Sequence, residues 1–254
     1  MNPTRRIKLP NLYNFRDLGG YETGDGRVTA WNRLYRCDCP SRLTENEWQA
    51  FRDRDIKTLI DLRSSYEAWE EPVSPPDDMR LISCHFFREE EGADLKGEAG
   101  KRFLASLSID YCVMAETSID RIALILKTIA GSMIDGNSAF FCSAGKDRTG
   151  IIAAEILKLC GVSDRDIISD YAVTEIYIAE VIKKKLDSLP KEILAEISPE
   201  TMEAAAFSKP ENMERYLKWS ADFGFLSQME KNGFSKELQG KLIEALSVRK
   251  PGVF

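Results

Sequence analysis

The stretch that decides the fold is Ser138-Ala139-Phe140-Phe141-Cys142-Ser143-Ala144-Gly145-Lys146-Asp147-Arg148-Thr149-Gly150. Its apolar beginning, residues 138–141, predicts a short strand. The apolar spacing that starts near Thr149 predicts a helix that ends at Gly161, a residue type typical of the position just after a helix. A strand, a tight loop and a helix in this order form the basic unit of an α/β fold.

The loop between this strand and this helix combines small residues with charged ones. Such a loop directs several backbone N–H groups and the positive end of the helix at one point, which favours a bound anion. Ser143, Ala144 and Gly145 allow the tight curl. The same field favours a thiolate at Cys142, and Arg148 can offer a two-pronged donor to a phosphate. These parts suit phosphoryl transfer through a cysteinyl-phosphate.

Other interpretations of the loop fit less well. A nucleotide-binding loop of the Walker A type needs glycine and Ser/Thr where this chain has Phe140 and Asp147. A cysteine protease would have to use His85, the only histidine, as its base. A buried and unreactive Cys142 in an unrelated loop is the remaining structural alternative.

Composition narrows the class of protein. The 254 residues are 43% hydrophobic and 30% charged, an ordinary balance for a folded globular chain. With 35 basic and 41 acidic residues the net charge is −6, which argues against nucleic acid as a partner but not against a small anionic substrate. No apolar stretch is long enough to predict a transmembrane segment.

The cysteines and the single histidine bear on location and cofactors. No apolar segment follows the charged N-terminus, so no signal peptide is predicted; the six cysteines then indicate reduced thiols of a cytoplasmic protein. A signal removed beforehand would leave secretion open. Cys37 and Cys39 are the only close cysteine pair, so no metal or other cofactor is predicted.

The rest of the chain predicts the architecture. Strand and helix patterns alternate before the decisive stretch: a short strand within 57–63, a helix over 66–70, an apolar run over 79–87 and helical spacing over 101–130. Thr44 and Glu47 form a capping box that begins an earlier helix. After residue 163 only helical patterns occur. We expect an α/β fold with a central, mostly parallel sheet flanked by helices, in one domain over 1–254 whose residues 176–254 form a helical extension or lid.

The spacing Cys142-x5-Arg148 resembles the signature of cysteine-dependent protein phosphatases. The fuller loop string is similar to the bacterial tyrosine phosphatase branch with C-x-x-G-K-D-R-T, which is related to dual-specificity and phosphoinositide phosphatases. Two other regions also match this branch: Asn14-Phe15-Arg16-Asp17-Leu18-Gly19-Gly20, and Leu34-Tyr35-Arg36 through Ser41-Arg42-Leu43-Thr44 to Asp61-Leu62-Arg63. The resemblance covers about residues 10–175 and implies a tyrosine-phosphatase-like fold.

The resemblance implies a metal-independent phosphomonoesterase that acts on phosphotyrosine proteins and releases inorganic phosphate, with phosphoinositides or phosphoserine and phosphothreonine as further substrates. Cys142 would be the nucleophile, and Arg148 with the backbone of 143–147 would hold the phosphate. The family usually has histidine where this chain has Phe141, which implies a weaker thiolate. A catalytically weak phosphate-binding module is therefore the alternative, and a sulfur-transfer enzyme, whose loop is usually one residue shorter, is more distant.

The general acid has two candidates. One carboxyl group can protonate the leaving oxygen and then activate water. Asp147 lies inside the loop, where the resembled branch has its proposed acid. Asp61 lies at the end of its predicted strand and could instead hold Arg63 or the loop.

Supporting roles also remain open between two interpretations. Thr149 is expected either to direct its hydroxyl at the sulfur or to cap the helix. Lys146 either contacts additional phosphates, as the resemblance implies, or is a solvated side chain beside Asp147. Arg16 and Asp17 are expected to brace the loop, unless Asp17 only holds its own turn.

Overall fold

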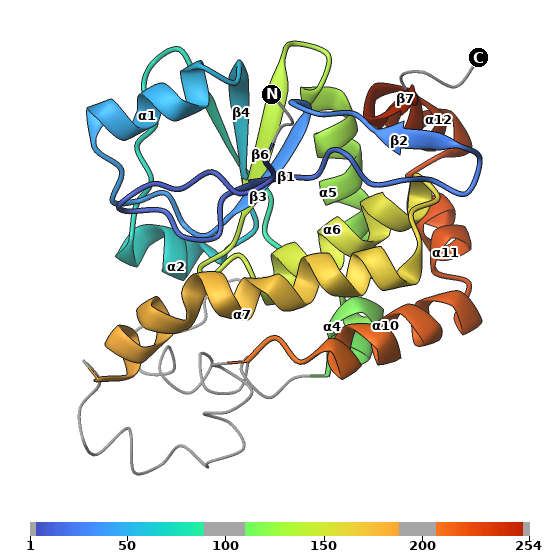
Figure 1. Cartoon of the computed structure of the whole chain (residues 1–254). Helices are drawn as coiled ribbons and strands as arrows, with labels where there is room; N and C mark the ends of the chain where they lie inside the picture. The colour runs from blue at the N-terminus through green and yellow to red at the C-terminus, as the bar shows by residue number, and fades with distance from the viewer. Residues whose placement is uncertain (1–3, 89–109, 188–206, 251–254) are drawn as a thin grey trace.

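The computed structural model describes residues 4–88, 110–187 and 207–250 (Figure 1). A sheet with the order β1-β3-β6-β4-β5 forms its centre. The strands are β1 (Arg16–Asp17), β3 (Leu34–Cys37), β6 (Asn137–Phe141), β4 (Ile56–Asp61) and β5 (Arg80–Ser83). The pairs β3–β6, β6–β4 and β4–β5 are parallel, and only β1 runs antiparallel to its neighbour. The predicted α/β fold with a mostly parallel sheet is confirmed.

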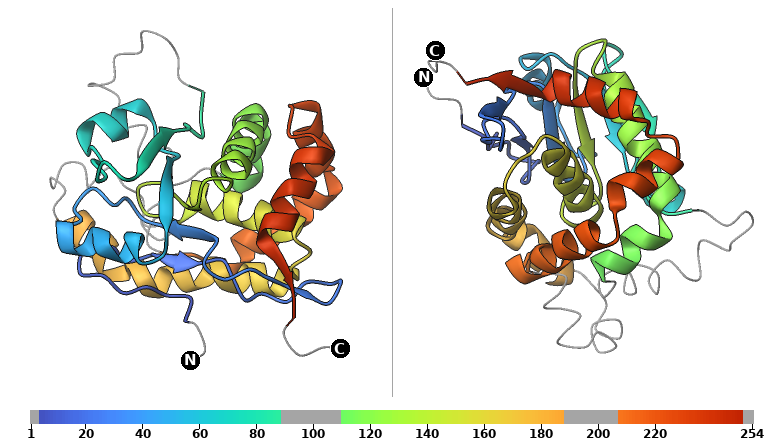
Figure 2. Two further views of the ribbon diagram at one scale, coloured as in Figure 1. Left: turned by 90° about the horizontal axis from the view of Figure 1, so that it is seen from above. Right: turned by 90° about the vertical axis from the view of Figure 1, so that its right-hand side faces the viewer.

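Helices cover both faces of this sheet (Figure 2). One face packs against α1 (Glu45–Arg52), whose Trp48 and Phe51 share a buried cluster with Tyr35 and Phe141. The other face carries α4 (Tyr111–Thr117), α5 (Ile119–Ser132) and α6 (Asp147–Leu159). All five residues of β6 are buried, as expected for a central strand covered on both sides.

Local signals in the sequence account for the helix ends. The capping box of Thr44 and Glu47 is present at the start of α1. Gly161 follows α6 with φ +80°, as predicted for the position after a helix. The helix α2 (Ser65–Glu70) has a second capping box from Ser64 and Glu67 and ends before Pro72. The helix α6 begins at Asp147, two residues earlier than predicted, so that Asp147 and Arg148 belong to its first turn.

The C-terminal part packs on the helical face. The helices α10 (Pro210–Asp222), α11 (Phe225–Lys231) and α12 (Lys236–Leu246) contact α4, α5 and α7 (Asp164–Asp187). The prediction of helices alone after residue 163 is wrong in one respect. The strand β7 (Ser247–Arg249) pairs antiparallel with β2 (Arg27–Thr29). Three residues paired with a strand more than two hundred positions away carry too little local pattern to be recognised.

Parts of two predicted helical segments lie outside the residues that the structure describes. Residues 101–109 of the predicted helical segment lie outside the described residues, as do residues 188–206 and 251–254 of the expected extension or lid. The described helices include none that is both long and apolar enough to cross a bilayer.

Candidate active site

The loop Cys142–Lys146 lies at the carboxyl edge of the sheet, between β6 and α6. Parallel register places Cys37 at the end of β3 and Asp61 at the end of β4 on either side of Phe141. The edge where parallel strands end is where α/β proteins bind ligands. The sheet thus places the last residues of three neighbouring strands side by side at the start of the loop.

The carbonyl groups of residues 143–145 all have hydrogen-bond donors outside the loop. The donors are the Cys39 N–H to Ser143 (3.1 Å), the Asn14 amide to Ala144 (3.0 Å) and Gly145 (2.9 Å), and Arg36 to Gly145 (2.8 Å). In a trans peptide the C=O and the next N–H point in opposite directions. With the carbonyls held outward, the N–H groups of 144–146 turn to the concave side, which is the arrangement of an anion cradle.

The backbone of this loop requires glycine at position 145. Gly145 has φ +64°, and a Cβ there would lie 2.3 Å from the Cys37 carbonyl oxygen. The next residue, Lys146, is the N-cap of α6 but provides no side-chain cap. The first N–H groups of α6 therefore remain available to an anion at the positive end of the helix.

A buried carboxylate on α7 holds the two arginines beneath the loop. Asp170 accepts from Arg16 at 2.8 Å and from Arg36 at 2.7 Å, and all three side chains are almost fully buried. Burial alone would raise the pKa of Asp170, but the two guanidinium charges hold it well below its usual value. Arg36 bonds the Gly145 carbonyl, while Arg16 bonds Asn14, which bonds the loop.

Of the two residues expected to brace the loop, only Arg16 has contacts that lead to it. Asp17 accepts hydrogen bonds from the backbone N–H groups of Gly19 (2.7 Å) and Asn32 (2.8 Å). Burial raises the pKa of Asp17 to about 6. These bonds match the alternative interpretation, in which Asp17 holds its own turn.

The arginine at the end of the loop is held by Glu67 of α2. Arg148 Nη1 and Nη2 donate to the two carboxylate oxygens at 2.6 and 2.7 Å, and the Ser143 hydroxyl donates to the same carboxylate. Burial would raise the pKa of Glu67, but Arg148 and Ser143 hold it well below its usual value. The pairing uses only the terminal nitrogens, so the Nε–H of Arg148 has no partner among the described residues and can reach a phosphate oxygen.

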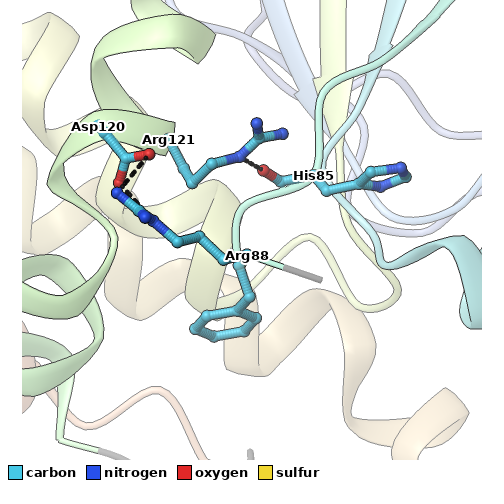
Figure 3. A pocket seen from close by; sticks show the side chains of 5 residues that line it. His85, Arg88, Asp120 and Arg121 are labelled. Carbon is cyan, nitrogen blue, oxygen red and sulfur yellow. Dashed lines mark hydrogen bonds and ion pairs between the residues drawn. The ribbon is translucent and has the colours of Figure 1, made fainter. Parts of the chain in front are cut away.

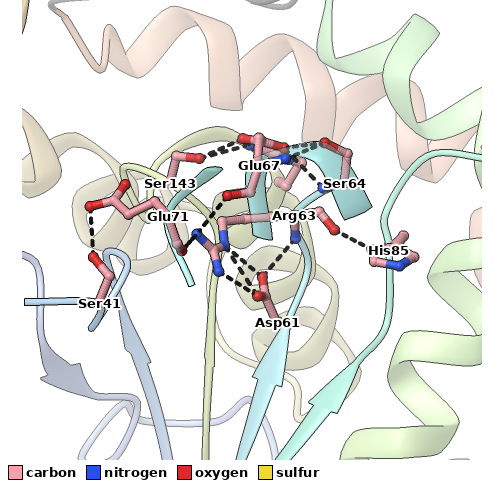
Figure 4. A network of polar contacts seen from close by, with 9 residues as sticks. Ser41, Asp61, Arg63, Ser64, Glu67, Glu71, His85 and Ser143 are labelled. Carbon is pink, nitrogen blue, oxygen red and sulfur yellow. Dashed lines mark hydrogen bonds and ion pairs between the residues drawn. The ribbon is translucent and has the colours of Figure 1, made fainter. Parts of the chain in front are cut away.

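Asp61 is committed to a different arginine (Figure 4). It forms an almost fully buried ion pair with Arg63 at 2.7 Å. Arg63 also donates to the carbonyls of Glu67 (3.4 Å), in the first turn of α2, and of Glu71 (2.8 Å), the residue that caps its C-terminal end. Asp61 thus fixes Arg63, Arg63 fixes α2, and α2 presents the carboxylate that holds Arg148. Of the two roles open for Asp61, these contacts support the structural one.

Phe141 and Cys142 lie on opposite faces of the sheet. Phe141 is fully buried in the cluster under α1, with the guanidinium of Arg63 5.4 Å from its ring centre. Cys142 is 2% exposed and belongs to the cluster under α5 and α6. A phenyl ring at position 141 donates no hydrogen bond to the loop, so other groups must stabilise a thiolate at Cys142.

Asp147 lies at the first position of α6 with its side chain 28% exposed. Its Oδ1 accepts from the hydroxyl of Tyr111, which in turn lies 2.6 Å from the hydroxyl of Tyr171. The ammonium of Lys146 is 3.5 Å from the same Oδ1 and 3.4 Å from the carbonyl oxygen of Phe207. Lys146 is buried, so the interpretation as a solvated lysine is wrong: the chain at Phe207 lies against it.

Thr149 does not cap the helix, because Lys146 occupies that position. The Thr149 side chain is fully buried, and its hydroxyl has no hydrogen-bond partner among the described residues. A buried hydroxyl without a protein partner can donate to a group that reaches the site. This fits the other expectation, a hydroxyl directed at the sulfur.

A separate pocket of about 420 Å³ opens between the segment after β5 and the start of α5 (Figure 3). It is lined by His85, Phe87, Arg88, Asp120 and Arg121. Arg88 pairs with Asp120 at 3.1 Å, and Arg121 donates to the His85 carbonyl at 2.8 Å. No residue of the loop lines this pocket, and its arginines already have partners, so we place the candidate site at the loop.

Several residues of the site were not predicted individually. Asn14 and Arg36 lie inside segments that the resemblance matched, but the sequence does not predict their hydrogen bonds to the loop carbonyls. Glu67 follows Asp61-Leu62-Arg63 by four residues, but the sequence predicts it only as part of a helix. Tyr111, Tyr171 and Asp170 are ordinary helix residues in the sequence, and only the packing of α4 and α7 brings them to the loop.

Comparison with known proteins gives a family match and several relatives. A family model described as the tyrosine phosphatase family matches residues 7–247. A tyrosine-protein phosphatase of Nostoc commune is 33% identical over 138 residues, which cover 54% of this chain and 46% of that protein. The triple specificity protein phosphatase PtpB of Mycobacterium tuberculosis is 26% identical over 227 residues, 77% of this chain and 78% of that protein.

The chain spans about half the length of the first curated relative and 61% of the second, from Cupriavidus necator. Among solved structures, TpbA of P. aeruginosa in complex with pTyr is 12% identical with a TM-score of 0.36, over 65% of this chain and 80% of that one.

Replacing the buried carboxylate tests the support beneath the loop. Asp170→Asn leaves Arg16 and Arg36 buried without their counter-charge, so we expect the free energy of unfolding to fall by about 3–5 kcal/mol. Because the pKa of Asp170 is lower in the folded chain than its usual value of 3.8, its stabilising effect is complete above about pH 4–5 and is lost as pH falls towards the folded-state pKa.

Urea unfolding at several pH values measures both effects. The wild type should lose stability more steeply than Asp170→Asn below about pH 4. The exposed Asp222, at the end of α10, gives the control: Asp222→Asn should change stability by less than about 0.5 kcal/mol. Equal stability of Asp170→Asn and the wild type would contradict the assignment.

Proposed function

We propose that this chain, which belongs to the tyrosine phosphatase family, hydrolyses phosphotyrosine through a cysteinyl-phosphate intermediate. The observation that carries the proposal is the loop itself. Its carbonyls are held outward by Asn14, Arg36 and Cys39, which leaves its N–H groups around a point between Cys142 and Arg148. A dianionic phosphate fits such a cradle of backbone donors and a guanidinium.

In the first step the Cys142 thiolate attacks phosphorus while the bond to the substrate oxygen breaks. The loop N–H groups and Arg148 hold the three other phosphate oxygens, on which charge is spread in the transition state. Glu67 keeps the guanidinium plane of Arg148 fixed, so no rearrangement of that side chain is needed at the moment of reaction. Asp147, in its protonated form, gives its proton to the leaving oxygen.

In the second step water attacks the phosphorus of the cysteinyl-phosphate and the P–S bond breaks. Asp147, now ionised, accepts a proton from this water, and inorganic phosphate leaves. The sulfur departs as a thiolate. The buried hydroxyl of Thr149 supplies a hydrogen bond to it, which gives this otherwise unpaired donor a function.

For the substrate class we rank phosphotyrosine first. The relative PtpB is named a triple specificity protein phosphatase, which supports more than one substrate class here. The further candidates are those that the resemblance implies: phosphoserine, phosphothreonine and phosphoinositides. The resemblance gave Lys146 the contact to additional phosphates, but its ammonium is buried beside Asp147 and the Phe207 carbonyl. Activity on phosphoinositides would therefore depend on moving Lys146 or on other cations.

Cys142→Ser tests the nucleophile. A serine hydroxyl is not ionised at neutral pH, so turnover should fall below about a hundredth of the wild type. Phosphate and vanadate should still bind, because the cradle consists of backbone groups and Arg148. Phosphatase assays and calorimetry with vanadate check both. Turnover above that level would contradict the nucleophile, and a wild type that binds phosphate without turnover would support a binding module instead.

A substrate panel in EDTA tests specificity and metal independence together. We expect undiminished hydrolysis of phosphotyrosine after dialysis against EDTA, since thiolate, cradle and arginine supply the nucleophile and the charge stabilisation. Rates on a phosphoseryl peptide and on inositol phosphates should be lower. Activity lost in EDTA and restored by zinc or magnesium would contradict metal independence. Faster hydrolysis of inositol phosphates would reverse the proposed order.

Asp147→Asn distinguishes the two candidate acids. Without a proton donor, kcat/KM for phosphotyrosine should fall about 10²–10⁴-fold, whereas a nitrophenyl phosphate, whose oxygen leaves without a proton, should lose far less. The measured quantity is the ratio of the two kcat/KM values.

Asp61→Asn is the comparison. It removes the partner of Arg63 and loosens α2, so it should lower stability and affect both substrates in equal proportion. A loss that depends on the leaving group in Asp61→Asn, together with an equal loss in Asp147→Asn, would exchange the two roles.

A further inference from the structure

Two tyrosine hydroxyls from different helices lead to the carboxyl group of Asp147. Tyr111 begins α4 and Tyr171 lies on α7; both rings are buried and meet edge to face, with centres 5.8 Å apart. The Tyr111 hydroxyl donates to Asp147 Oδ1, and the two hydroxyl oxygens are 2.6 Å apart. Neither tyrosine belongs to the loop or to the sequence segments that match the phosphatase branch.

The direction of the hydrogen bonds follows from the number of protons. A hydroxyl has one proton, so a Tyr111 hydroxyl that donates to Asp147 must accept from Tyr171. Burial, with the charge of Asp147, raises the pKa of Tyr111 well above its usual value, and burial likewise raises that of Tyr171. Both stay protonated at neutral pH, so the chain of donors ends at Asp147 under working conditions.

The bond also distinguishes the two oxygens of the carboxyl group. Tyr111 and the more distant Lys146 ammonium both approach Oδ1, and Oδ2 has no partner among the described residues. The side chain is 28% exposed, so this second oxygen has room for a substrate. If the proton of the neutral carboxyl group were on Oδ1, it would face the proton of the Tyr111 hydroxyl, which already donates to that oxygen. The proton therefore resides on Oδ2.

We propose that Tyr111, supported by Tyr171, is a positioning residue that fixes Asp147 with Oδ2 as the oxygen that delivers and receives the proton. This inference rests on the proposed function, in which Asp147 is the acid and base. The hydroxyl prevents rotation of the carboxyl group, so the proton points at the leaving oxygen rather than at Tyr111. Packing of α4 and α7 against the loop thereby becomes a condition of general acid catalysis.

Other charged groups around Asp147 do not replace this hydroxyl. Lys146 approaches the same oxygen at 3.5 Å, which is an ion-pair distance without a short hydrogen bond. The guanidinium of Arg148 is held by Glu67, away from this role. The tyrosine hydroxyl is thus the directional contact, whereas the two cations act by charge alone.

Tyr111→Phe removes the hydroxyl and keeps the ring. We expect kcat/KM for phosphotyrosine to fall about tenfold and that for nitrophenyl phosphate to fall less than about threefold. Tyr171→Phe leaves the bond to Asp147 but removes its supporting donor, so the same selective loss should be smaller, about threefold. In an Asp147→Asn background, Tyr111→Phe should change the ratio of the two kcat/KM values no further.

The matched control is Tyr216→Phe. That buried hydroxyl donates to the buried Glu155 at 2.8 Å, so its loss should lower the unfolding midpoint without changing the ratio. An unchanged ratio in Tyr111→Phe with a changed ratio in Asp147→Asn would overturn the inference and leave the proposed acid in place. Unchanged ratios in both would remove the acid as well. If Tyr111→Phe does not fold, Tyr171→Phe decides by the same ratio.

Discussion

The buried carboxylate of Asp170 is the contact on which the loop depends most. Asp170 compensates two guanidinium groups that would otherwise be buried unpaired, at a cost of several kcal/mol each. Through Arg36 and Asn14 it determines where the loop carbonyls point. Within this triad one negative charge faces two positive ones. Burial and the neighbouring Arg16 lower the pKa of Arg36 to about 10, which still leaves it charged at neutral pH.

A second arginine–carboxylate system holds the other side of the loop. Asp61 pairs with Arg63, which bonds the carbonyls of Glu67 and Glu71 (Figure 4). Glu67 of α2 in turn holds Arg148. The two systems have different consequences. The one beneath the loop fixes the backbone donors, while the one above fixes the side-chain donor. Preorganised donors reduce the rearrangement that binding a phosphate requires, which is the physical reason for two arginine–carboxylate systems around one loop.

Sequence reasoning located the loop because its signal is local. A strand, small residues, a cysteine, an arginine and a helix follow one another within thirteen residues, and the structure places them at the carboxyl edge of the sheet as predicted. The supports of the loop could not be found in this way. Asp170 and Tyr111 act through contacts between elements far apart in the chain, and an isolated aspartate or tyrosine on a helix has no pattern that distinguishes it. The strand β7 could not be predicted from the sequence for the same reason.

The two candidate acids show how surroundings separate residues that look alike in sequence. Asp61 is held by the Arg63 guanidinium in a site closed to solvent, so both of its oxygens are already engaged. Asp147 is partly exposed and bonded on one oxygen by a hydroxyl, a weaker contact that either protonation state accepts. A group that must both give and take a proton needs an open oxygen and a bond that does not depend on its charge. In the proposed reaction Asp147 meets both conditions, and Asp61, by its burial and its partner, meets neither.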